Sequence, residues 1–145
     1  MKLFNLFSLI FCLCIVLLMS CDPVDNRLKF LNLSRDSIVV QISNDSLNFP
    51  FNNYAFYETT IISPDSTLKI SKMGSDHAME DYINEGQSKR LFAVVFQIDT
   101  INKYQHSMTL DSLLKKKKYN DLSSYSIKEL TQHNWIISYK KVGNK

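Results

Sequence analysis

Cysteine is rare in this 145-residue chain, and its three copies, Cys12, Cys14 and Cys21, all lie in the first 21 residues. Residues 22–145 therefore contain no thiol that could form a disulfide, bind a metal as thiolate or act as a nucleophile. Any folded domain in that part of the chain must be stabilised by packing and hydrogen bonding.

Glycine and proline are also scarce, with three copies of each. The isolated Gly74, Gly86 and Gly143 cannot form a phosphate-binding glycine loop. The chain contains neither a Gly-x-Ser-x-Gly elbow nor a His-Glu-x-x-His motif. We therefore expect no enzyme and no cofactor, although a hydrolase using surface acids stays open as the weakest alternative.

The chain has only a small excess of positive charge. Its formal net charge is +3, and Lys2 contributes one unit of it. Such a small surplus predicts no nucleic-acid partner. The basic run 115–118 could contact lipid headgroups, but lysines at the end of a short helix more often stay solvated and offset its dipole.

The longest apolar run spans residues 3–18, directly after Lys2. A short basic start, an apolar core and a small residue at Ser20 are typical of a secretory signal peptide. The run is shorter than the roughly 20 apolar residues of a spanning helix. An uncleaved signal anchor and an ordinary cleaved signal are the competing interpretations.

The residues that follow the apolar run, Leu18-Met19-Ser20-Cys21, resemble the lipobox of bacterial lipoproteins. The resemblance implies cleavage between Ser20 and Cys21 and attachment of a diacylglycerol, commonly with a further acyl chain, to Cys21. Because each buried methylene contributes about 0.8 kcal/mol, two or three chains would hold a small domain at a bilayer. The implied location is the cell envelope.

The acids at Asp22 and Asp25 are compatible with sorting signals of lipoproteins. We favour the outer membrane over the inner one, while the periplasmic or surface face stays open. The expected organisation is a signal peptide over 1–20, a tether over 21–26, one β-rich globular domain over 27–140 and a frayed tail over 141–145.

Alternating apolar residues predict most of the domain as strands. The expected strands cover 27–33, 37–43, 54–62, 67–71, 90–99 and 135–140. Polar turns at 34–36 and 63–66 suggest that the first four form two hairpins. The stretch 90–99 is apolar on both faces, so we expect a central strand that is covered on both sides.

Spacing of three and four predicts a short helix over 75–85, with Ser75 or Asp76 as its cap and Gly86 at its end. Two more are expected over 109–117 and from Ser126, where Ser126 and Glu129 match a capping box. A turn is expected over 100–106. The predicted fold class is β-rich α+β, as a small antiparallel β-sandwich or a single sheet with two or three short helices.

The C-terminal half contains four characteristic segments: Asp81-Tyr82-Ile83, the strand 91–99, Ile127-Lys128-Glu129-Leu130 and Asn134-Trp135-Ile136-Ile137-Ser138-Tyr139. In this order they resemble small uncharacterised Bacteroidota lipoproteins. These segments are packing motifs, so the resemblance implies fold and envelope location and assigns no catalytic residue.

Five aromatic residues cluster around Pro50 and form a candidate binding patch: Phe49, Phe51, Tyr54, Phe56 and Tyr57. If exposed, they would form a stacking platform for a glycan or peptide, whereas folded onto the core they would only contribute buried area. A second candidate is His77 with Glu80, three residues apart, which would supply half of a metal site. We interpret that pair as a solvated helix face and expect no metal.

Together these observations predict a lipid-anchored cell-envelope protein that acts as a non-catalytic binding or structural accessory module. The alternative is a carbohydrate- or peptide-binding module that uses the aromatic patch. The expected partners are the membrane, through Cys21, and an envelope protein or glycan.

Overall fold

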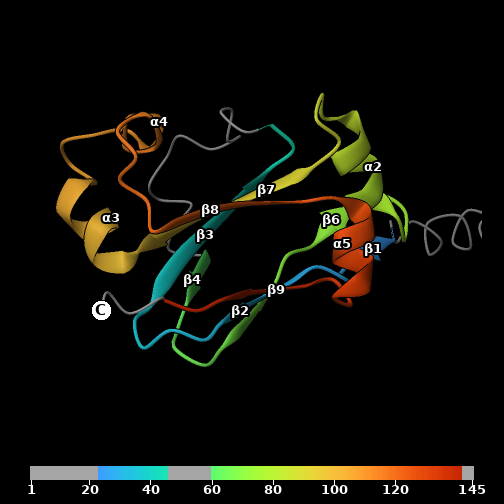
Figure 1. Cartoon of the computed structure of the whole chain (residues 1–145), viewed down its shortest axis with the longest axis horizontal. Coiled ribbons are helices and arrows are strands. Elements are labelled where there is room, and N and C mark those ends of the chain that lie inside the picture. The colour runs from blue at the N-terminus through green and yellow to red at the C-terminus, as the bar shows by residue number, and fades with distance from the viewer. Residues whose placement is uncertain (1–22, 46–59, 142–145) are drawn as a thin grey trace, which may run out of the picture.

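The computed structural model describes residues 23–45 and 60–141. Within these ranges the chain is β-rich, with nine strands and four helices (Figure 1). The strands are β1 (Val24–Asp25), β2 (Lys29–Asn32), β3 (Ile38–Ser43), β4 (Ile61–Ile62), β5 (Thr67–Lys69), β6 (Lys72–Met73), β7 (Leu91–Gln97), β8 (Asp121–Tyr125) and β9 (Ile136–Tyr139). The helices are α2 (Ala78–Glu85), α3 (Ile98–Tyr104), α4 (Leu110–Lys115) and α5 (Ile127–Gln132).

The strands of the described residues form three sheets, in the orders β4-β3-β7-β8, β5-β2-β9 and β1-β6. All pairings are antiparallel except that of β2 with β9, which is parallel. The predicted β-rich α+β class is therefore confirmed. The helices lie at the two ends of the sheets, α2 and α5 with β1 and β6 at one end and α3 and α4 at the other (Figure 1).

The central strand is β7, as its two apolar faces predicted. Val94 and Phe96 pack with α3 and α4 through Ile101, Leu110 and Leu113. Leu91, Ala93 and Val95 face the main core on the other side. Burial on both faces explains why this strand shows no polar alternation.

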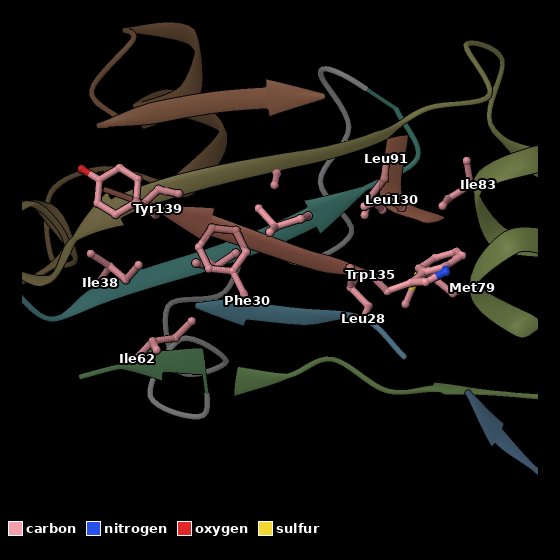
Figure 2. Close-up of a cluster of buried hydrophobic side chains, with 14 residues drawn as sticks. Leu28, Phe30, Ile38, Ile62, Met79, Ile83, Leu91, Leu130, Trp135 and Tyr139 are labelled. Carbon is pink, nitrogen blue, oxygen red and sulfur yellow. The ribbon is translucent and has the colours of Figure 1, made fainter. Parts of the chain in front are cut away.

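The main core lies between the two larger sheets and extends to α2 and α5. Its members are buried side chains from β2, β3, β4, β7 and β9 together with Met79, Ile83, Leu130 and Trp135 from the helical end (Figure 2). Strand β9 and the residue before it show the predicted alternation, with Trp135, Ile137 and Tyr139 buried and Ile136 and Ser138 exposed.

The two predicted hairpins are wrong. Strands β2 and β3 lie in different sheets, and so do β4 and β5. The chain crosses between the sheets twice, at 33–37 and 63–66, so that β2-β5 and β3-β4 form one bent ribbon. A turn-like sequence between two strands indicates that the chain changes direction. Here the chain turns into the other sheet at a corner and does not return along the same sheet.

Asn32 holds this corner together from a fully buried position. Its Nδ2 donates to the carbonyl oxygens of Asp36 (2.9 Å) and Ile62 (3.0 Å). Its Oδ1 accepts from the backbone N–H of Ser34 (2.9 Å) and from the Ser34 hydroxyl (2.6 Å). One amide side chain thereby satisfies backbone groups on both crossing segments.

Three local predictions need correction. Residues 98–104 form helix α3, where the predicted strand continued to 99 and a turn was expected over 100–106, and β8 lies in a stretch for which no element was predicted. Val24 and Asp25 form β1, so the ordered domain begins before residue 27 and the tether is shorter than 21–26. Helix α5 and its capping box at Ser126 are confirmed.

Candidate functional site

The residues to which the sequence assigns the anchor and the aromatic patch lie outside the described part of the chain. This applies to Ser20 and Cys21, and to Phe49, Phe51, Tyr54, Phe56 and Tyr57. Lipidation, cleavage and a binding role for the rings therefore stay predictions.

The chain enters the domain through a two-stranded ribbon, which we call the entry ribbon: β1 paired with β6. Val24 pairs with Met73 and Asp25 with Lys72. The ladder extends one residue further toward the N-terminus, because the N–H of Gly74 donates to the carbonyl oxygen of Pro23 at 3.0 Å. The backbone is thus held in place two residues after Cys21.

Asp25 is the central side chain at this end of the molecule, and its carboxylate is fully buried. It accepts hydrogen bonds from the backbone N–H of Arg27 (3.1 Å) and from Nε and Nη2 of its guanidinium (3.0 and 2.8 Å). It also accepts from the backbone N–H of Met79 at 3.1 Å. Burial of a charge is tolerated because four donors surround it.

The bond from Met79 makes Asp25 the cap of helix α2. The residue at the N-cap position, His77, makes no side-chain capping bond. An N2 amide is normally satisfied by the side chain at the N-cap. Here a carboxylate from β1, distant in sequence, takes that place and also meets the positive end of the helix dipole.

Arg27 connects the entry ribbon to two further elements. Its Nη1 donates to Oε1 of Glu80 at 2.7 Å, which bridges to α2. Its guanidinium carbon lies 4.3 Å from the ring centroid of Trp135, at the start of β9. Cation–π contact and ion pairing together link both ends of the described chain.

These contacts determine the ionisation of the acids. Burial alone would raise the pKa of Asp25, but the hydrogen bonds from Arg27 and Met79 outweigh it and the pKa is lowered. The pKa of Glu80 is also lowered, chiefly by its hydrogen bond from Arg27. Both carboxylates are therefore held ionised as structural partners.

The predicted His77–Glu80 pair is present, with Nδ1 of His77 3.2 Å from Oε1 of Glu80. The same oxygen accepts from Arg27, so it takes part in the ion-pair network. No cluster of three or more His, Cys, Asp or Glu side chains suited to a metal occurs among the described residues. His106 follows the C-cap of α3 and His133 is the C-cap of α5, and these two helices lie at opposite ends of the molecule (Figure 1).

The basic run 115–118 lies at the end of α4 and after it. Lys115 forms an ion pair with Asp111 one helical turn earlier, at 2.6 Å. The ammonium of Lys118 lies 5.1 Å from the centroid of the Tyr104 ring. Both contacts fit the interpretation of these lysines as a solvated helix end.

A cavity of about 200 Å³ lies between the bent ribbon and α2, behind the entry ribbon. Its wall is largely apolar, with Val40, Ile42, Leu68, Ile70 and Met79, and its polar members include Ser71, Lys72 and Tyr82. The Lys72 ammonium lies 4.1 Å from the Tyr82 ring centroid. Sequence patterns did not predict this cavity, because it depends on how two sheets diverge.

No helix in the described ranges is long and apolar enough to cross a membrane. No protein-family model, curated protein or solved structure matches this chain. The resemblance to Bacteroidota lipoproteins and to the lipobox therefore stays a prediction from the sequence.

Proposed function

We propose that this chain is a lipid-anchored cell-envelope protein whose β-rich domain serves as a non-catalytic binding or structural accessory module. The observation that carries the proposal is the position of Cys21. It follows the apolar run 3–18 by three residues and stands two residues before Pro23, which already accepts a hydrogen bond within the domain. Such a short connection suits a domain that works at the membrane surface.

The contacts of the ionisable groups support a structural role for them. Asp25, Arg27 and Glu80 form one network that joins β1, α2 and β9. Glu129 belongs to the capping box of α5 and pairs with Arg90 at 3.0 Å. Asp36 pairs with Lys141 at 3.0 Å and accepts from Gln97. In each case the charged group stabilises a helix end or a strand junction.

Metabolic labelling with an alkyne palmitate tests the anchor. The wild-type protein should take up the label and float with membranes. Cys21→Ser should lose the label and keep residues 1–20, because the modified thiol is the signal for cleavage in the lipoprotein family that the lipobox resembles. A Cys21→Ser protein that remains labelled, or a wild type without label, would refute the proposal.

Protease treatment of intact cells then locates the domain. Digestion of the labelled protein would place it on the cell surface, where it meets glycans or proteins from outside. Protection would place it on the periplasmic face, and a structural accessory role would follow.

The cavity behind the entry ribbon favours a second function, the binding of one small apolar group. Its volume of about 200 Å³ exceeds that of engineered cavities of roughly 150 Å³ that bind benzene. It therefore suits an aromatic ring, such as the side chain of a bound peptide. A carbohydrate- or peptide-binding role for the aromatic patch remains a separate prediction.

Titration with p-cresol, an analogue of the tyrosine side chain, tests this function. In amide NMR spectra of the domain, saturable shifts should concentrate at Leu68, Ile70 and Tyr82. The substitution Ser71→Trp should abolish them by filling the cavity, whereas Ser107→Trp, at an exposed site after α3, should not. Equal shifts in both variants would exclude the cavity as the site.

A further inference from the structure

The entry ribbon carries an exposed apolar pair. Met73 is the most exposed large apolar side chain of the described residues, with 72% of its surface accessible, and its cross-strand partner Val24 is 39% exposed. Paired residues of an antiparallel ladder project from the same face. Val24 and Met73 therefore present one apolar spot to the outside of the molecule.

The opposite face of the same ribbon points into the protein. Asp25 is buried in its ion-pair network, and Lys72 lines the cavity with its ammonium over the Tyr82 ring. The alternation is thus apolar outward and charged inward, the reverse of a ribbon exposed to water on its outer side. The outer face of the entry ribbon therefore offers its apolar residues, and not its charged ones, to a partner outside the domain.

The covalent chain limits what that partner can be. At about 3.6 Å per residue, the Cα atom of Cys21 lies at most about 7 Å from that of Pro23. Pro23 is itself fixed on the ribbon through Gly74. A lipid on Cys21 would therefore hold the headgroup layer of its bilayer directly beside Val24 and Met73.

We propose that the outer face of the entry ribbon rests on the bilayer, with Val24 and Met73 in contact with the headgroup and upper acyl region. This inference rests on the lipid anchor proposed above and adds an orientation to it. The end with β1, β6 and α2 faces the membrane, and the end with α3 and α4 points away from it (Figure 1).

A fluorescent label tests the orientation in the full, processed protein. The variants are Met73→Cys, at the proposed contact, and Asn102→Cys, at an exposed position of α3. Residues 22–145 contain no other cysteine, and a lipidated Cys21 has no free thiol, so a maleimide dye reacts only at the introduced site. The proteins are reconstituted into phosphatidylethanolamine–phosphatidylglycerol vesicles that contain a headgroup nitroxide lipid.

We expect the nitroxide to quench the dye at position 73 and to leave the dye at position 102 largely unquenched, because only position 73 would lie at the level of the headgroups. Equal quenching at both positions, in proteins that float with the vesicles, would overturn the orientation and leave the anchor intact. Wild-type protein that takes up maleimide at Cys21, or fails to float, would instead refute the anchor and the inference with it.

Discussion

Asp25 lies in a segment whose sequence resembles a polar tether, yet its side chain joins three elements. It is the acceptor for Arg27 and for the first turn of α2, and Arg27 in turn contacts Trp135. A buried carboxylate with four donors is costly to alter, because asparagine would oppose two of these donors with its own N–H groups.

The substitution Asp25→Asn should lower the free energy of unfolding at neutral pH by about 2 to 3 kcal/mol, the cost of leaving buried donors unpaired. The folded-state pKa of Asp25 is lowered. Its contribution is therefore complete above the unfolded carboxyl pKa near 3.9 and disappears as the pH falls through the folded-state value. The difference in free energy of unfolding between variant and wild type, measured by urea unfolding, should be smaller near pH 3 than at neutral pH.

Asp81→Asn is the matched control, because Asp81 is an exposed acid in the first turn of the same helix. It should change stability by well under 1 kcal/mol. An Asp25→Asn protein as stable as this control at neutral pH would show that the network does not hold the entry ribbon.

At the scale of elements, the junction of α5 and β9 is a Schellman motif. The N–H of Asn134 donates to the carbonyl oxygen of Thr131, and that of Trp135 to Leu130 at 2.7 Å. Asn134 adopts a left-handed conformation with φ of 52°, and Trp135 follows with φ of 60°. Leu130 and Trp135 meet in the core, the apolar contact that accompanies this motif.

Asn134→Ala should destabilise the domain by about 1 kcal/mol, because alanine pays a steric cost in the left-handed region. Asn134→Gly should keep or slightly raise stability, since glycine adopts this conformation freely. Thermal unfolding of the two variants checks this. If alanine is tolerated as well as glycine, the motif is not what orients β9.

Elements whose signals lie within their own sequence, such as a capping box or a regular alternation of apolar residues, were predictable. The capping box placed the start of α5, and the alternation after Trp135 identified β9. The predicted cap of α2, Ser75 or Asp76, was wrong. The backbone N–H of Met79 donates instead to the carboxylate of Asp25, which is distant in sequence. Helix α3 was missed because its isoleucines resemble a continuation of β7, although Ile98 and Ile101 have helical spacing and both contact the second core cluster.

Gly86 lies where the sequence predicts the end of α2, but the physical reason for a glycine at this position is different from the predicted one. It ends α2 as expected, but its backbone is extended with φ of −70° and ψ of 144°. A Cβ there would collide with the carbonyl oxygen of Asn44, at the end of β3. Glycine is needed for the close approach of the helix end to the sheet, which only the tertiary structure reveals.

At the scale of the whole molecule, period-two patterns identified which faces are buried but could not identify strand partners. The corner at Asn32 separates β2 from β3, and the entry ribbon pairs residues almost fifty positions apart. Each depends on long-range contacts to polar residues whose local sequence resembles a turn or a tether. The candidate site was only partly predictable for the same reason: the sequence predicts an anchor at Cys21, whereas the network, the cavity and the apolar pair are apparent only in the structure.

We propose that a lipidated Cys21 joins this domain directly to a membrane. Intact-mass spectrometry of the protein extracted from membranes is the decisive test. We expect one species with the mass of residues 21–145 plus a diacylglycerol and, where the amine is modified, a further acyl chain. A species that retains residues 1–20, or an unmodified chain beginning at Cys21, would contradict it.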